Sequence, residues 1–218
     1  MSENKQLTRK DFLKGMGYTA ASVVAVGSLS GLLTGCTSPA PAADVDTSQA
    51  PAYPWTYKKL DLAVVEEAAY KGYKEKGGWG AGVAEGFFGT LATEVGYPYN
   101  QIPRAAFTNY GAGFQQGALC GALGVAAVCI GSVCEPDTAK KILVELENWY
   151  KEAELPIYQP DMELPTTVAN SILCNDSVGK FMEKSGYEYG SNERKTRCAG
   201  VTADVTKKMV ELLNAQFA

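Results

Sequence analysis

The sequence predicts an all-α protein, a compact bundle of about six helices around a central helix rich in small residues. Apolar residues recur at helical spacing between capping residues and glycines over most of residues 55–218, and no strand-like alternation persists. Residues 117–133 form a nearly uncharged stretch of Gly, Ala, Val, Leu and Cys. A helix that is apolar all round belongs at the centre of a bundle.

The first predicted helices are bounded by residues that cap or end a helix. Asp61 is placed to cap a helix that runs to Lys76 and ends at Gly77-Gly78. A second helix is expected over residues 83–95. A short third helix over residues 103–110 begins with a proline, which is favoured at the first position of a helix.

The later helices are separated by glycines and prolines. The predicted central helix over residues 117–133 follows a break at Gly111-Ala112-Gly113. An amphipathic helix over 138–152 follows, whose apolar side consists of Ile142, Leu143, Leu146, Trp149 and Tyr150. A surface loop over 155–167 then contains three prolines. The remaining elements are a short helix over 176–184 and a last helix over 193–215, capped by Ser191-Asn192.

Residues 1–35 have the layout of a cleaved signal peptide. Basic residues precede a weakly hydrophobic run over residues 15–35, and small residues precede Cys36. A transmembrane anchor is the alternative, since about 20 apolar residues span a bilayer. Glycine, serine and threonine dilute this run, which favours the signal peptide.

Cys36 is the predicted site of lipid attachment. Leu33-Thr34-Gly35-Cys36 resembles the bacterial lipobox, whose thiol is joined to diacylglycerol before cleavage. Thr8 to Lys14 resembles the twin-arginine export signal, although Lys10 replaces the second arginine and leaves the ordinary export route open. The mature protein is therefore expected outside the cytoplasm, anchored to a bilayer through acylated Cys36. Residues 36–54, rich in Pro and Ala, should form an extended tether before a folded domain over 55–218.

Composition excludes several classes of function. Residues 1–35 hold four of the 20 basic and two of the 24 acidic residues, which leaves 16 against 22 and a net charge of −6 in the mature chain. An acidic chain without a basic cluster is not expected to bind nucleic acid. The chain has no histidine, which excludes Ser-His-Asp and Cys-His catalytic sites and histidine ligands for zinc or haem.

Five cysteines lie in the predicted domain, and this odd number leaves at least one thiol unpaired within the chain. Cys129 and Cys134 are interpreted as small buried hydrophobic residues. Cys174 and Cys198 fall at or just inside predicted helix N-termini, where the helix dipole favours a thiolate. On one straight helix, Cys120, Cys129 and Cys134 cannot pair with one another.

The stretch from Gly117 to Leu123, with Cys120 at its centre, resembles the central motif of the C_GCAxxG_C_C family of redox-active proteins. Within that family the chain is most similar to the split-Soret cytochrome c-like branch. The similarity covers most of the predicted domain, including residues 54–61, 145–150, 173–174, 193–198 and 210–214. The resemblance implies that Cys120, Cys174 and Cys198 match three of the family's spaced cysteines and are the catalytic or redox-active residues.

The chain also departs from the family. The family's first cysteine is expected just after a glycine-rich helix start, but residues 77–81 contain none. Covalent haem is not expected, because no cysteine is followed by histidine. An iron–sulfur site is short of one ligand unless Cys129 or Cys134 supplies it, so the cofactor stays open.

The resemblance therefore indicates a membrane-anchored redox lipoprotein, with a thiol/disulfide or thiolate–metal site and a membrane or periplasmic redox partner. The alternative is a non-catalytic binding or structural lipoprotein that has lost its cofactor ligands.

Overall fold

A computed structural model of the chain describes residues 50–218, and the predicted signal peptide, Cys36 and the tether up to residue 49 lie outside this part. The described part is helical apart from one two-stranded antiparallel sheet, so the all-α prediction is confirmed. The α-helices are α2 (Leu62–Lys76), α3 (Trp79–Ala84), α4 (Thr90–Glu94), α5 (Gly121–Val133), α6 (Pro136–Glu152), α7 (Cys174–Ser185) and α8 (Asn192–Gln216). The remaining elements are the π-helical turns Glu85–Gly89 and Gly113–Gly117, the 3₁₀ helices Tyr99–Gln101 and Arg104–Tyr110, and the strands β1 (Glu154–Leu155) and β2 (Thr167–Val168).

Two helices begin where a side chain caps them, as predicted. The Asp61 carboxylate accepts hydrogen bonds from the backbone N–H groups of Ala63 and Val64, and α2 ends at the left-handed Gly77. The Ser191 hydroxyl accepts a hydrogen bond from the backbone N–H of Arg194 at the start of α8. Each cap satisfies N–H groups that have no partner inside the helix.

The helix expected to begin at Val83 begins four residues earlier, at Trp79. The glycines before Val83 lie inside the helix because its backbone passes very close to its neighbours. A Cβ atom on Gly80 would lie 2.1 Å from the Phe107 carbonyl oxygen, and one on Gly82 would lie 2.8 Å from the Ala69 carbonyl oxygen. These glycines therefore permit close packing and do not end a helix.

The predicted central helix begins at Gly121 and not at Gly117. Residues 113–117 form a separate turn with left-handed residues, and Leu119 then makes an isolated antiparallel β-bridge with Leu173. The helix α7 begins at Cys174, two residues before its predicted start, and α6 includes Pro136. These shifts matter for the site because they place Cys120 before a helix and Cys174 at the first residue of one.

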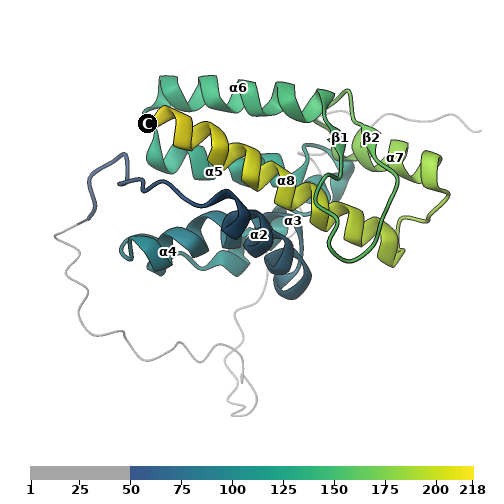
Figure 1. Ribbon diagram of the computed structural model, residues 1–218, viewed down its shortest axis with the longest axis horizontal. Helices are drawn as coiled ribbons and strands as arrows, with labels where there is room; N and C mark the ends of the chain where they lie inside the picture. The colour runs from purple at the N-terminus through teal and green to yellow at the C-terminus, as the bar shows by residue number, and fades with distance from the viewer. Residues whose placement is uncertain (1–49) are drawn as a thin grey trace, which may run out of the picture. The chain divides into compact units, whose positions relative to one another are not determined.

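The core is formed mainly by α5 and α8. The helix α5 packs against α3, α6 and α8, and α8 also packs against α2, α3 and α6 (Figure 1). Most residues of both helices are buried. The centre of the bundle thus contains the predicted small-residue helix and, beside it, the last helix. None of the helices in residues 50–218 is long and apolar enough to cross a membrane.

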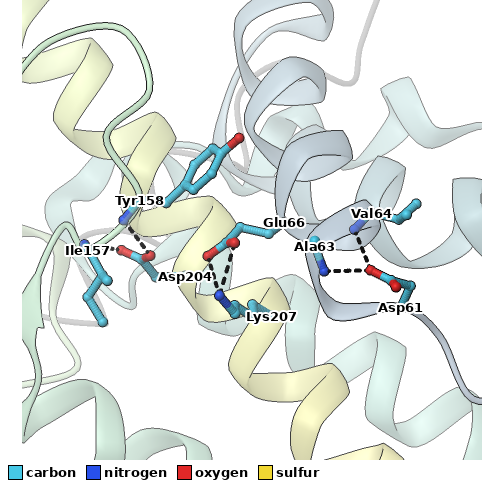
Figure 2. Close-up of polar contacts among 8 residues, drawn as sticks. All are labelled: Asp61, Ala63, Val64, Glu66, Ile157, Tyr158, Asp204 and Lys207. Carbon is cyan, nitrogen blue, oxygen red and sulfur yellow. Dashed lines mark hydrogen bonds and ion pairs between the residues drawn. The ribbon is translucent and has the colours of Figure 1, made fainter.

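Polar side chains on α8 hold two other segments. Lys207 donates to both carboxylate oxygens of Glu66 on α2, at 3.0 and 3.1 Å (Figure 2). The buried Asp204 carboxylate accepts the backbone N–H groups of Ile157 and Tyr158 at 2.8 and 2.9 Å (Figure 2). Asp204 therefore fixes the proline-rich loop between β1 and β2 on the surface of α8.

This carboxylate gives the fold a pH dependence. Burial raises the pKa of Asp204 from 3.8 to about 6, against the effect of its two backbone hydrogen bonds, and Glu66 raises it further. The folded protein therefore holds one more proton than the unfolded chain between these values. The contribution of Asp204 to the free energy of unfolding should fall as the pH rises from about 4 to 6, by up to roughly 3 kcal/mol.

Asp204→Asn should remove this slope, because asparagine keeps a carbonyl acceptor and does not titrate. The measurement is urea denaturation of wild type and variant between pH 4 and 7. The exposed Asp137→Asn is the control and should follow the wild type. If the Asp204 variant loses stability with pH as steeply as the wild type, the assignment of this titration to Asp204 is wrong.

Candidate functional site

Cys120 and Cys174 are brought together by the isolated bridge between Leu119 and Leu173. The backbone N–H of Cys120 donates to the Ile172 carbonyl at 2.9 Å, and that of Cys174 donates to the Ala118 carbonyl at 2.6 Å. Each cysteine follows one partner of the bridge, and side chains alternate between the two faces of a strand. The two thiols therefore lie on the face opposite to the two leucines.

Cys198, on α8, lies beside the same cavity as Cys120 and Cys174. All three cysteines line one enclosed cavity of about 10 Å³, which is about the smallest space that can hold a water molecule. The other lining residues come from four helices: Trp79, Tyr150, Ser177, Val178, Arg197 and Val201. All five cysteines of the described part are free thiols. Cys120, Cys174 and Cys198 are called the cysteine cluster below.

The sequence predicted that Cys174, at a helix N-terminus, favours the thiolate. For the buried free thiol of this structure that prediction is wrong. Burial raises the pKa of Cys174 to about 12, and the nearby Cys120 and Cys198 raise it further, while Arg197 and Arg194 lower it. Cys198 is the seventh residue of α8 and so lies beyond the first turn, where the helix dipole acts most strongly. Burial also raises the pKa of Cys120, although the Tyr150 hydroxyl and two backbone N–H groups oppose it.

A buried polar network surrounds the cysteine cluster. Arg197, only 1% exposed, donates to the Ser177 hydroxyl at 2.8 Å, and its other terminal nitrogen lies 4.0 Å from the Cys198 sulfur. The Tyr150 hydroxyl donates to Ser177 at 3.0 Å and also interacts with the Cys120 thiol. The Arg197 guanidinium makes no ion pair with an acidic side chain within residues 50–218, and its Nε atom has no hydrogen-bond partner.

Arg197, Ser177 and Tyr150 were not identified from the sequence. Arg197 precedes Cys198 and Ser177 lies three residues after Cys174, so each is close in the sequence to a candidate cysteine. Tyr150 was assigned only to the apolar face of its helix. The sequence gives no separate signal for Arg197, because an arginine next to a core-facing cysteine can be buried, paired or turned to solvent.

Cys129 and Cys134 lie outside the cluster. Both are buried in the main hydrophobic core, and neither lines the enclosed cavity. Burial raises the pKa of both thiols. They therefore have the surroundings of small apolar core residues, and neither is placed beside Cys120, Cys174 and Cys198 to complete a four-thiolate site.

The residues present do not fit the haem or the metal site that the family resemblance raises. Covalent haem needs a histidine after the second attachment cysteine, and the chain contains no histidine. Within the described part, no group of three or more histidine, cysteine, aspartate or glutamate side chains is arranged to hold a metal ion. Trp79, in the glycine-rich segment where the family's first cysteine was expected, lines the cavity with its indole ring.

Comparison with known proteins finds a matching family and relatives of this chain. A family model described as "Putative redox-active protein (C_GCAxxG_C_C)" matches residues 83–212. The chain is 31% identical over 220 residues to the split-Soret cytochrome c of Desulfovibrio desulfuricans, covering 96% of this chain and 78% of the relative. A solved structure of a split-Soret cytochrome c from that species, reported with a novel iron centre, has a TM-score of 0.72 and 32% identity, and the match covers 75% of this chain and 72% of that chain.

Proposed function

Because this chain belongs to the C_GCAxxG_C_C family of redox-active proteins, we propose that it is an exported lipoprotein that exchanges disulfides with a partner protein through Cys120, Cys174 and Cys198. The observation that carries the proposal is the buried Arg197 beside three converging thiols. Among residues 50–218, its ordinary hydrogen bond goes to the neutral Ser177 hydroxyl, the Cys198 sulfur lies 4.0 Å from its other terminal nitrogen, and its guanidinium lies 5.7 Å from the centre of the Phe181 ring.

A buried guanidinium without an acidic partner is costly, because the charge loses water and gains no opposite charge. A purely structural role for this site would be served as well by an apolar residue. A negative charge on the cysteine cluster, formed when a disulfide opens, would neutralise Arg197. The buried Arg197 cation, unfavourable for folding while the thiols are neutral, then serves to stabilise the thiolate formed during the reaction.

The proposed reaction starts from a disulfide between Cys174 and an inner sulfur, that of Cys120 or Cys198. A thiolate of the partner attacks the Cys174 sulfur, forms a mixed disulfide and breaks the internal bond. The inner sulfur leaves as a thiolate near Arg197, where the positive charge and the Ser177–Tyr150 network stabilise it. A leaving thiol whose anion is stabilised leaves faster.

A second partner thiolate then attacks the partner's own sulfur in the mixed disulfide and releases Cys174. The partner's two thiols become a disulfide, the protein's disulfide becomes two thiols, and two protons pass from the partner to the protein. The raised pKa of Cys174 makes it the slower leaving thiol in this second step, in which it takes up a proton on release. The oxidised protein is mixed with a reduced dithiol peptide, the two are separated, and their thiols are counted: the protein should gain two thiols and the peptide should lose two.

The membrane location rests on the N-terminal sequence. A basic segment, a weakly apolar run and the lipobox that ends at Cys36 support export and lipid attachment. The mature chain carries a net charge of −6, so attraction to anionic headgroups does not supply the attachment. An extracytoplasmic location also suits the proposed chemistry, because disulfides persist there.

Cys36→Ala should prevent lipidation and leave the protein unprocessed or released. The measurement is membrane fractionation with intact-mass analysis of wild type and variant. Cys134→Ala, which removes another cysteine from the chain, is the control and should stay processed and membrane-bound. If the Cys36 variant is processed and anchored like the wild type, the lipoprotein proposal fails while the thiol chemistry remains open to its own tests.

A further inference from the structure

A surface cleft of about 600 Å³ lies on the other side of Cys174 from the enclosed cavity. Cys174 and Val178 line both spaces, whereas Cys120 and Cys198 line only the cavity. The cleft has the volume of an ordinary ligand site. Of the three cluster thiols, the Cys174 thiol is therefore the one that a molecule in the cleft meets first.

One wall of the cleft is a left-handed turn. Ala112, Phe114 and Gln115 have φ values of 49°, 57° and 62°, a region that residues other than glycine seldom adopt. The turn is held against the start of α7 through Gly117, where a Cβ atom would lie 2.0 Å from the Asn175 side-chain oxygen. This packing places the side chains of residues 115 and 116 beside Cys174.

The polar lining of the cleft consists of uncharged groups. Gln115, Gln116 and Asn175 supply primary amides, and the remaining side chains include Met182 and Tyr189. Primary amides both donate and accept, as a peptide backbone does. A ligand with a carboxylate or ammonium group would find no opposite charge among these lining residues.

We infer that this cleft binds a cysteine-bearing segment of a partner polypeptide with uncharged flanking residues, and that Cys174 is the sulfur that bonds to it. The inference rests on the proposed function, because the bond formed is the mixed disulfide of that exchange. The amides of the lining pair with the backbone of the segment, and Val178 and Met182 supply apolar contact. The partner thiolate attacks Cys174, and the inner cysteine leaves into the closed cavity.

Access is tested by alkylation, which needs no redox activity. The fully reduced full-length protein is treated with iodoacetamide, and modification is followed by peptide mapping. Cys174 should be modified first among the cluster thiols, with Cys120 and Cys198 following only after unfolding in urea. Earlier modification of Cys120 or Cys198 would overturn the assignment of Cys174 as the outward sulfur, whatever the outcome of the exchange reaction.

The ligand class is tested with three reduced peptides that carry one cysteine flanked by Gly and Ser, by Asp, or by Lys, each mixed with the oxidised protein. The Gly/Ser peptide should form the mixed disulfide fastest, and peptide mapping should locate it at Cys174. Gln116→Glu should slow that peptide by roughly threefold to tenfold, the effect of about one lost hydrogen bond. Gln101→Glu, an exposed glutamine outside the cleft, is the matched control and should leave the rate unchanged.

Equal rates for the three peptides, or equal effects of the two glutamine variants, would overturn the peptide-binding cleft. If the Asp or the Lys peptide reacts faster than the Gly/Ser peptide, the cleft prefers a charged ligand, and the inference of an uncharged segment is also overturned. If no peptide forms a mixed disulfide while iodoacetamide still modifies Cys174 first, the proposed exchange and the peptide site that rests on it both fail, and only the access of Cys174 remains.

Discussion

Replacement of Cys174 by serine is expected to abolish oxidation of a dithiol peptide by this protein, with a loss of at least about a hundredfold, or roughly 2.7 kcal/mol in activation free energy. Serine keeps the size and polarity of the residue but cannot form the internal or the mixed disulfide. Cys174 lines both the enclosed cavity and the surface cleft, and of the three cluster cysteines it alone lines the cleft.

The measurement is the rate at which peptide thiols disappear on mixing with the oxidised protein. Cys129→Ala is the matched control, because Cys129 is buried in the core away from the cluster, and it should keep the wild-type rate per folded molecule. Circular dichroism of both variants checks that each is folded. A folded Cys174→Ser protein with wild-type rate would exclude Cys174 from the reaction.

Arg197→Met is expected to slow the exchange reaction without lowering the stability of the fold. Methionine fills a similar volume without charge, so it removes the unpaired Nε atom and the cost of the buried cation. Replacing buried charges by apolar residues is often neutral or stabilising by about 1–4 kcal/mol. We therefore expect the reduced variant to unfold at an equal or higher urea concentration than the wild type.

The same change should slow exchange by roughly 10- to 100-fold, because a hydrogen bond to a charged group contributes about 1.5–3 kcal/mol. Arg197→Lys keeps the charge and should recover part of the rate. A variant that is strongly destabilised, with an unchanged exchange rate, would show that Arg197 is only structural.

The parts of the fold that could be predicted from the sequence are those with a local cause. Asp61 and Ser191 cap α2 and α8 as expected, because a cap depends on the side chain and the next three residues. The apolar spacing of α6 likewise predicted one apolar face of five residues, of which Ile142, Leu146 and Tyr150 are buried and Leu143 and Trp149 are partly buried.

The errors arose where contacts distant in sequence decide the local structure. The start of α3 includes glycines that look like helix breakers, and close packing against Phe107 and Ala69 is what requires them. The start of α5 is displaced because residues 118–120 pair with residues 172–174. Neither partner segment could be recognised from spacing alone.

The sequence singled out the three cysteines of the candidate site but not its buried arginine. The spacing of the family's cysteines directed attention to Cys120, Cys174 and Cys198, which line one cavity. The burial of Arg197 and its contacts with Ser177 and Cys198 depend on how α7 and α8 pack. For the same reason the expected thiolate at Cys174 was wrong, since burial outweighs the helix dipole there.

Disulfide mapping of the full-length protein tests the central claim most directly. The protein is equilibrated in an oxidising and then a reducing thiol buffer, free thiols are blocked, and all cysteine peptides are identified by mass spectrometry. In the oxidised state we expect a disulfide that links Cys174 to Cys120 or Cys198, and in the reduced state two more free thiols, with Cys129 and Cys134 free in both. Free thiols at all five cysteines of residues 120–198 in both buffers, or a disulfide that includes Cys129 or Cys134, would contradict this expectation.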